Sequence, residues 1–310
     1  MVQGLVRSFL LWCASNQWLA AHVPKWRFAR RAVKRFMPGE DFESALRAAQ
    51  ASKPKNIGVL FTELGENVSD LREATAVVEH FEMVLTRASE AGVDPVVSVK
   101  PTHLGFDIDR ATCLANLQRL AAAAERVDGY LWVDMEGTAY TEATLDLYAA
   151  VRKEHERVGL AIQAYLYRTA TDIGRLLPLH PTIRLVKGAY AEPADRAWPA
   201  KRDVDANYLA LSTFMLPAVK RKELRLVLGT HDLPMIRRIT SFAEALGIEK
   251  RDVEVNMLYG IQSEALQRLA AEGHTTRQLI SYGNAWYAWY VRRLAERPEN
   301  MMFVARQLFA

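Results

Sequence analysis

The stretch TIRLVK (Thr182–Lys187) has the short, apolar and β-branched character of a buried parallel strand. Seven similar runs accompany it at intervals of about 30 residues, which is the length of one βα unit. The eight runs are Asn56–Phe61, Asp94–Lys100, Gly129–Met135, Gly159–Leu166, Thr182–Lys187, Arg225–Gly229, Asp252–Met257 and Arg277–Tyr282. Eight strands that alternate with helices predict an α/β fold closed into a parallel (βα)8 barrel of the TIM type.

Apolar residues recur at helical spacing between these runs. Examples are the series Val204, Tyr208, Leu211, Met215 and the series Ile236, Ile239, Ala243, Leu246. Gly92 and Gly247 stand where two of these helices should end. We therefore expect an N-terminal helical segment over residues 1–50 and one barrel domain over residues 51–310.

A formal charge of +4 over 310 residues is too small to indicate nucleic acid as a partner. With 50% hydrophobic and 25% charged residues, the composition is typical of a soluble globular protein with a sizeable core. Cys13 and Cys113 are far apart and belong to no His, Cys or carboxylate cluster at metal-ligand spacing. We expect free thiols, a reducing cytoplasmic compartment and no metal site.

The first twenty residues are apolar, but they are too short and interrupted to span a bilayer and lack the features of a secretion signal. Their apolar members include Leu5, Phe9, Leu10, Leu11 and Trp12, and a basic stretch from Lys25 to Arg35 follows. An amphipathic helix of this kind can lie on the barrel or on an anionic membrane surface. The sequence leaves both possibilities open.

Polar residues stand where nearly every predicted strand ends. They are Lys100, Asp134, Gln163, Arg184, Lys187, Thr230, His231 and Asn256. Each alone could cap a helix or satisfy a buried partner, but unpaired polar groups inside a barrel are costly. Because TIM barrels carry their chemistry at the carboxyl ends of the strands, the set predicts a pocket. Its excess of cations favours an anionic ligand, such as a phosphorylated cofactor or a carboxylate.

Two adjacent arginines, Arg292 and Arg293, follow an aromatic cluster on what is predicted to be the last helix. Paired guanidiniums can bind one carboxylate through charge-assisted hydrogen bonds, while Tyr and Trp faces cover the apolar part of a small acid. The alternative is an amphipathic helix whose charges face water.

No Ser or Cys stands in the context of an activated nucleophile, and the adjacent His231 and Asp232 cannot form a hydrolytic dyad. A Schiff-base lysine, Lys100 or Lys187, remains as an alternative of the aldolase type. The sequence has no glycine-rich dinucleotide motif after the first strand and no P-loop.

Several motifs together resemble the proline dehydrogenase family, in particular its short monofunctional bacterial members. RLVKGAY (184–190), GTHD (229–232), MLYG (257–260) and YVRRLAERPEN (290–300) carry the resemblance. MPGE (37–40), LGENV (64–68), VKPT (99–102) and DME (134–136) add to it. The similarity covers essentially the whole chain beyond about residue 35.

The resemblance implies a distorted barrel that binds FAD non-covalently. It also implies oxidation of L-proline to Δ1-pyrroline-5-carboxylate by hydride transfer to flavin N5, the first step of proline catabolism. Matching positions for the substrate carboxylate are Lys100, Arg292 and Arg293, with Asp134 beside the lysine. Matching positions for the flavin are Gln163, Arg184, Lys187, Gly188, Ala189, Thr230, His231 and Asn256. Lys100, Asp134 and Arg184 are expected to act in catalysis.

The residues expected around the substrate ring are Tyr190, Leu279 and Trp289. Leu279 and Trp289 stand where the family usually has tyrosines, and Asn256 lies in a Val-Asn pair that replaces Phe-Gln. L-proline is the expected substrate, and a related cyclic amino acid such as hydroxyproline is the alternative. A barrel that binds flavin or an amino acid without efficient turnover is a further alternative. A quinone acceptor is hypothesised, and it would bring the N-terminus to the inner face of the membrane.

Overall fold

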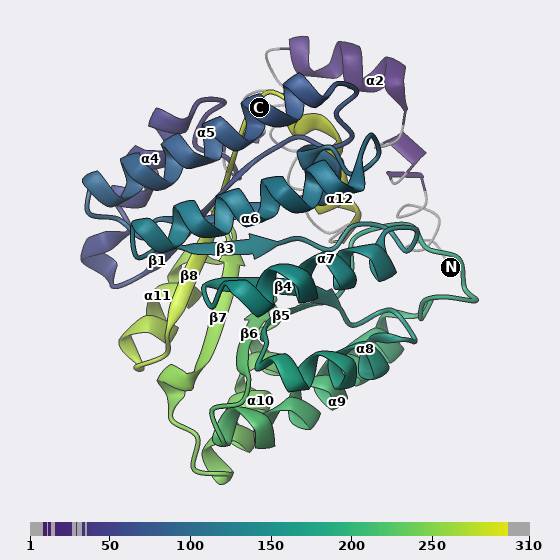
Figure 1. The fold of residues 1–310 in the computed structure, drawn as a ribbon. Helices are drawn as coiled ribbons and strands as arrows, with labels where there is room; N and C mark the ends of the chain where they lie inside the picture. The colour runs from purple at the N-terminus through teal and green to yellow at the C-terminus, as the bar shows by residue number, and fades with distance from the viewer. Residues whose placement is uncertain are drawn as a thin grey trace.

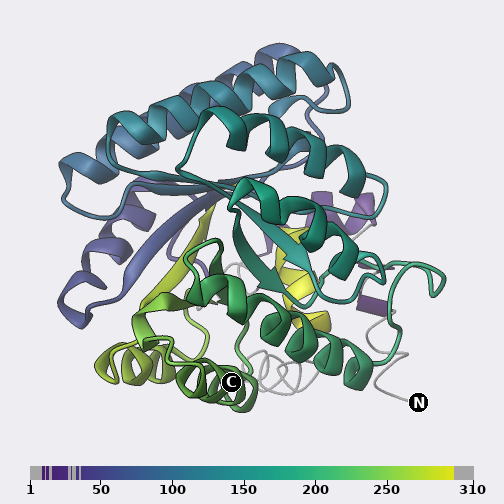
Figure 2. The ribbon, with the colours of Figure 1, turned by 60° about the horizontal axis from the view of Figure 1, so that its bottom comes forward.

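Eight parallel strands close into a barrel that is surrounded by helices (Figures 1 and 2). The structure is a computed structural model that describes residues 9–10, 12–13, 16–26, 29, 33–34 and 36–296. At residues 17, 21, 24, 292–293 and 295–296 only the backbone is described. The strands follow one another in chain order, and β1 pairs with β8 so that Leu60 lies opposite Leu279. This topology confirms the predicted (βα)8 barrel.

Each strand overlaps one of the predicted runs. The strands are β1 (Gly58–Glu63), β2 (Val96–Val99), β3 (Tyr130–Val133), β4 (Val158–Gln163), β5 (Thr182–Val186), β6 (Arg225–Gly229), β7 (Val253–Leu258) and β8 (Thr276–Tyr282). β2 and β4 are buried at every residue, because helices cover the outside of a parallel barrel and side chains fill its inside.

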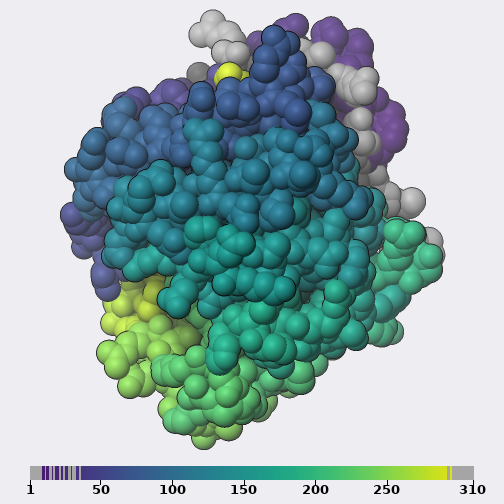
Figure 3. All heavy atoms as spheres, viewed as in Figure 1, coloured from purple at the N-terminus to yellow at the C-terminus, as the bar shows by residue number. Residues whose placement is uncertain are grey.

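The helices run between the strands and cover the outer surface; α5, α6 and α7 cover the side seen in Figure 3. The α-helices are α2 (Gln17–His22), α4 (Phe42–Gln50), α5 (Leu71–Glu90), α6 (Arg110–Arg126), α7 (Thr141–Glu154), α8 (Thr169–Leu176), α9 (Lys201–Lys220), α10 (Leu233–Ala245), α11 (Ser263–Ala271) and α12 (Trp286–Glu296). The short 3-10 turns are η1 (Val23–Lys25), η2 (Lys53–Lys55), η3 (Pro101–Leu104), η4 (Leu177–Leu179) and η5 (Lys250–Asp252).

Helix ends follow the expected residue types. Asp70 caps α5 by accepting a hydrogen bond from the backbone of Arg72 at 2.7 Å. Gly92 and Gly247 lie just past α5 and α10 with positive φ values of 66° and 70°, as expected for residues that end helices. The expectation that Leu246 extends the buried face of α10 is wrong. Leu246 is the residue after the last turn, and it is 47% exposed.

A buried group of charges closes the amino end of the barrel. Glu254 on β7 is 2% exposed and pairs with Arg225 of β6 and, at 3.2 Å, with Nε of Arg277 on β8. Arg277 also reaches Asp94 at 2.6 Å. Burial raises the pKa of Glu254, but Arg277 and Arg225 outweigh it and hold this pKa below its usual range. The charges compensate one another, so this end of the barrel is closed by a neutralised ionic layer.

The N-terminal segment packs on the last helix. Buried Leu10, Ala29 and Val33 form a hydrophobic cluster with Trp286, Tyr287, Trp289, Tyr290 and Val291 of α12. Tyr287 donates to the Cys13 carbonyl at 3.3 Å. Of the two possibilities left open above, packing on the protein is therefore observed for this segment. None of the helices within the described residues has the length and apolar character that crossing a bilayer requires.

Candidate active site

Arg184 and Asp134 form an ion pair inside the barrel. The Arg184 guanidinium also donates to Ser98 Oγ at 2.8 Å and lies over the Trp132 ring, 4.6 Å from its centroid. Ser98 Oγ in turn donates to Asp134 at 3.0 Å. The arginine side chain is 4% exposed and the aspartate side chain 23% exposed, so the carboxylate keeps contact with solvent. Two of the three residues expected to act in catalysis are therefore in contact.

Lys100, the third of these residues, stands directly after β2. Its ammonium donates to the carbonyl oxygen of Gly65 at 3.3 Å. Gly65 lies on the loop after β1, and any side chain there would overlap the ring of His103. Burial, followed by the charge of Lys100, lowers the pKa of His103 to about 4, so the imidazole is neutral at physiological pH. The loops after β1 and β2 thus hold the lysine at the rim.

Gln163 ends β4 and is 2% exposed. Its amide nitrogen donates to the carbonyl oxygens of Met135 and Glu136, both at 3.2 Å. Among the described residues, Gln163 Oε1 has no hydrogen-bond partner, and neither have Arg184 Nη1 and Asn256 Oδ1. Buried polar atoms without partners are costly, so these three atoms mark positions where a ligand could complete the hydrogen bonding.

The ammonium of Lys187 is bound by two carboxylates. Asp205 of α9 lies at 2.5 Å and Asp232, the N-cap of α10, lies at 2.7 Å. The sequence suggested that this lysine offers a free positive charge to the rim. In the structure, the two carboxylates balance its charge. An ammonium has three N–H donors, so one donor remains for a further acceptor.

The ends of β6 and β7 bring three more predicted site residues to the rim. His231 accepts a hydrogen bond at Nε2 from the backbone of Leu258, at 3.4 Å. Thr230 accepts one from the backbone of Asp232 at 3.2 Å. Asn256 lies deeper, is 5% exposed and donates to Glu254 at 2.8 Å, which links the site to the ionic layer below.

The loop after β5 carries Gly188, Ala189 and Tyr190, which are all partly buried. Gly188 has a φ of 114°, and a side chain at this position would overlap the Tyr165 ring. Glu192 binds the loop after β3 by accepting a hydrogen bond from the backbone of Thr138 at 2.8 Å and another from its hydroxyl. The chain after β5 is therefore fixed against the loops that follow β3 and β4.

The two residues that stand where the family usually has tyrosines occupy different environments. Leu279 on β8 is partly buried and packs on the interior cluster that contains Leu60 and Trp132. Trp289 is 9% exposed and belongs to the cluster between α12 and the N-terminal segment. Helix α12 also carries Arg292 and Arg293, whose side chains lie outside the described residues.

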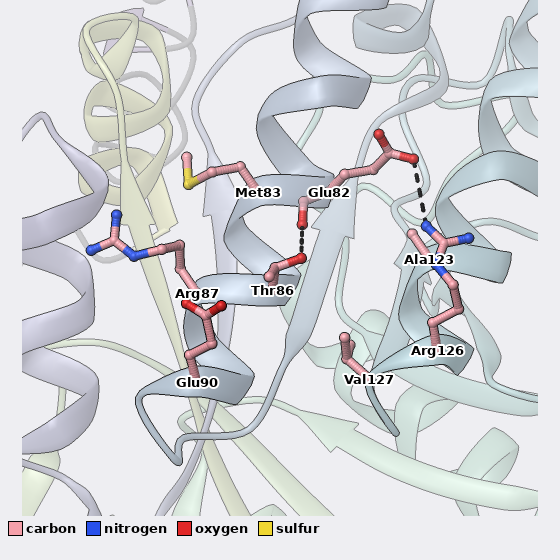
Figure 4. A pocket seen from close by; sticks show the side chains of 8 residues that line it. All are labelled: Glu82, Met83, Thr86, Arg87, Glu90, Ala123, Arg126 and Val127. Atoms are coloured by element: carbon pink, nitrogen blue, oxygen red, sulfur yellow. Dashed lines mark hydrogen bonds and ion pairs between the residues drawn. The ribbon is translucent and has the colours of Figure 1, made fainter.

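A groove of about 410 Å³ lies away from this rim, on the outer surface between α5 and α6 (Figure 4). Its lining includes Glu90, the last residue of α5, and Val127, which follows α6. In a βα barrel the helices run opposite to the strands, so these ends lie at the amino end of the barrel. The groove is therefore separate from the polar rim.

Three polar residues that sequence inspection overlooked support the site. Ser98 stands two residues before Lys100 on the same face of β2, so strand alternation could have placed it inside the barrel. Glu136 stands two residues after Asp134, and its carboxylate accepts two hydrogen bonds from Thr102. Glu254 stands two residues before Asn256 on the same face of β7, so the same alternation could have placed it inside the barrel.

A closed parallel barrel with a cationic and amide-lined rim at its carboxyl end is the architecture of a TIM-barrel enzyme. The family model described as proline dehydrogenase matches residues 45–306. The chain belongs to the proline dehydrogenase family. This confirms the resemblance drawn from the motifs, and membership of an oxidoreductase family does not support the aldolase alternative.

Relatives match the chain over nearly its full length. It is 36% identical to the proline dehydrogenase of Deinococcus radiodurans, a match that covers 99% of this chain and 98% of that protein. It is 32% identical to proline dehydrogenase 1 of Bacillus subtilis subsp. natto, with 97% and 98% covered.

Proline utilization A (PutA) from Bdellovibrio bacteriovorus, a solved structure of the enzyme inactivated by N-propargylglycine, has the same fold with a TM-score of 0.80. The two chains are 22% identical, and the match covers 94% of this chain. The chain spans only 37% of the length of that protein.

Proposed function

We propose that this chain is an FAD-dependent dehydrogenase that oxidises L-proline to Δ1-pyrroline-5-carboxylate. The observation that carries the proposal is the contact between Arg184 and Asp134 at the rim, in a chain of the proline dehydrogenase family. Lys100, directly after the strand β2 that pairs with β3, supplies a cation for the substrate carboxylate. This set of residues can orient a small amino acid, which is the main task of a protein whose cofactor performs the chemistry.

The rim fits a flavin. A flavin ring has donors and acceptors along its edge, and the buried atoms of Gln163, Arg184 and Asn256 that lack partners among the described residues include both kinds. Gly188 is a proposed contact through its backbone only, because the Tyr165 ring fills the space where its side chain would stand. The remaining proposed contacts are Lys187, Ala189, Thr230 and His231. When bound, FAD supplies the acceptor for the hydride that leaves the substrate carbon.

Lys100 would bind the substrate carboxylate together with Arg292 and Arg293 of α12. Asp134 would border the same pocket while its ion pair fixes the Arg184 guanidinium, so that a positive charge is held beside the reacting groups. Tyr190, Leu279 and Trp289 are the proposed contacts to the substrate ring.

Leu279 favours a second candidate, in which the substrate is a related cyclic secondary amino acid such as hydroxyproline. Its side chain is partly buried against the barrel interior and carries no hydroxyl group. A leucine can therefore distinguish substrate rings only by their shape, and contact of this kind discriminates only weakly between L-proline and close analogues.

A quinone is the proposed electron acceptor, and the N-terminal segment is the proposed membrane contact. Phe9, Trp12 and Trp18 are 57–60% exposed, and Lys25 beside them is exposed. Aromatic and basic residues on one segment suit the surface of an anionic membrane. Flotation with anionic liposomes should recover the protein, and replacing Trp12 and Trp18 with serine should abolish this. Equal flotation with neutral liposomes would contradict the contact.

Steady-state oxidation with a soluble quinone tests the reaction. Purified protein that contains FAD should oxidise L-proline and release the pyrroline product. A comparison with 4-hydroxyproline and pipecolate decides between the two candidate substrates. Bound flavin without turnover of any of the three amino acids would overturn the proposal and favour a barrel that only binds its ligands.

A further inference from the structure

Glu136 is a buried carboxylate that the proposed reaction leaves without a role. It follows β3 on the loop that also carries Asp134, and it is 3% exposed. Burial raises its pKa, while hydrogen bonds from Thr102 and the charge of Lys100 lower it, and the net shift is upward. Burying a carboxylate costs free energy unless both of its oxygens accept hydrogen bonds. The partners of Glu136 therefore indicate what this residue does.

Both carboxylate oxygens of Glu136 are bound by one residue. Oε2 accepts a hydrogen bond from the backbone N–H of Thr102 at 3.0 Å, and Oε1 accepts one from the Thr102 hydroxyl at 2.6 Å. Thr102 is fully buried on η3, the turn that starts directly after Lys100. The two hydrogen bonds therefore fix the backbone two residues from the lysine.

The same short segment holds the other parts of the rim. Asp134 binds Arg184 with its side chain, and the carbonyl oxygens of Met135 and Glu136 bind Gln163. Residues 134–136 thus connect to β5 and β4, and through Glu136 to the turn after β2. A displacement of this segment would move the lysine relative to the arginine and the glutamine.

We propose that Glu136 is a positioning residue for Lys100: by holding Thr102 it sets where the lysine ammonium stands, and thereby how tightly the enzyme binds the carboxylate of its substrate. This inference rests on the proposed function, because it takes Lys100 to be the carboxylate partner. It assigns to Glu136 an effect on the substrate KM rather than on turnover.

The test is a double-mutant cycle between Glu136→Gln and Lys100→Met, measured as KM and kcat for L-proline in the FAD-loaded enzyme. Glutamine keeps the shape of the side chain but loses the charge. We expect Glu136→Gln to raise the KM by about tenfold in the wild-type background, with kcat within about twofold. In the Lys100→Met background the same change should leave the KM unaltered, because the positioned group is gone.

Thr102 provides a second route that avoids changing the buried charge. Thr102→Val removes one of the two hydrogen bonds and should raise the KM. Thr102→Ser keeps the hydroxyl, so its KM should equal that of the wild type. Glu192→Gln is the matched comparison, since Glu192 accepts the same pair of hydrogen bonds from Thr138, which lies on the same loop as Glu136 but is not bonded to the turn after β2. Any effect of Glu192→Gln should be the same with and without Lys100.

The outcomes separate the two proposals. If Lys100→Met leaves the KM unchanged, the role of Lys100 in the proposed function is wrong. If Lys100→Met raises the KM, but Glu136→Gln has no effect or the same effect in both backgrounds, the positioning role is wrong and the proposed function stands.

Discussion

Arg184 and Asp134 meet inside the barrel although they lie 50 residues apart in the chain, since Arg184 is on β5 and Asp134 directly follows β3, and these two strands are not neighbours. Ser98 bridges them, accepting from the arginine at 2.8 Å and donating to the aspartate at 3.0 Å. The guanidinium is thus held in one place by two partners and one aromatic face. A buried charge that is fixed before the substrate arrives needs no rearrangement during the reaction.

Replacing Asp134 with Asn should lower kcat for L-proline by about a hundredfold, because the buried guanidinium loses its fixed partner. The flavin content should change little, since most proposed flavin contacts remain. Kinetic assays together with the flavin absorbance of the purified variant check this prediction. Asp128→Asn is the control, because Asp128 pairs with Arg157 at the surface and its side chain is 87% exposed. Unchanged turnover in Asp134→Asn would refute the assigned role.

The ionic layer at the amino end should matter for stability. Glu254→Gln leaves Arg225 and Arg277 without their shared counter-ion, and breaking such a buried pair costs roughly 3–5 kcal/mol of unfolding free energy. Urea denaturation at neutral pH measures the loss. Glu244→Gln serves as the control, because Glu244 is half exposed and pairs with Lys250 at 3.8 Å, so it should cost less than about 1 kcal/mol. Equal losses in the two variants would argue against a structural layer.

His103 should make stability depend on pH. Its pKa is lowered to about 4 by burial and by Lys100, so the folded protein keeps it neutral while the unfolded chain binds a proton at about 6.5. The unfolded state binds more protons between these values, so this contribution is complete above about pH 6.5 and is lost as the pH falls toward 4. The full loss is about 3 kcal/mol. Urea denaturation of wild type and His103→Asn across this range should give converging curves at low pH, and parallel curves would exclude the effect.

Leu279 should influence which ring the enzyme accepts. Leu279→Tyr adds volume and a hydroxyl group to the interior face of β8, and it should lower kcat/KM for 4-hydroxyproline relative to L-proline by about tenfold. Parallel assays with both amino acids measure this ratio. An unchanged ratio would mean that Leu279 does not contact the substrate ring.

The barrel could be predicted because its strands are local signals. Each parallel strand is buried on both faces and so appears as an apolar run, and TIRLVK coincides with β5 apart from its last residue. Arg184, named among the polar residues near the strand ends, lies inside the barrel on β5. Leu246 was misplaced because helical periodicity does not reveal where the last turn ends.

The partners of the site residues were not predictable in the same way. Lys187 was predicted to contact a ligand, and nothing in the sequence indicated that Asp205 of the next helix, α9, and Asp232 at the start of α10 would also bind its ammonium. Glu136 binds Thr102 from the turn after the neighbouring strand β2, and Glu254 binds Arg225 and Arg277 on the neighbouring strands β6 and β8, so it is the strand pairing that brings these partners near. Hydrogen-bond partners distant in sequence are set by topology and register, which composition and local pattern do not encode.

Anaerobic addition of L-proline to the purified yellow protein is the decisive measurement of the proposed reaction. We expect the flavin absorbance to bleach with one proline consumed per flavin, and Lys100→Met to shift the bleaching to higher proline concentrations. A flavin that stays oxidised at saturating proline, in protein that retains its cofactor, would show that the chain does not oxidise L-proline.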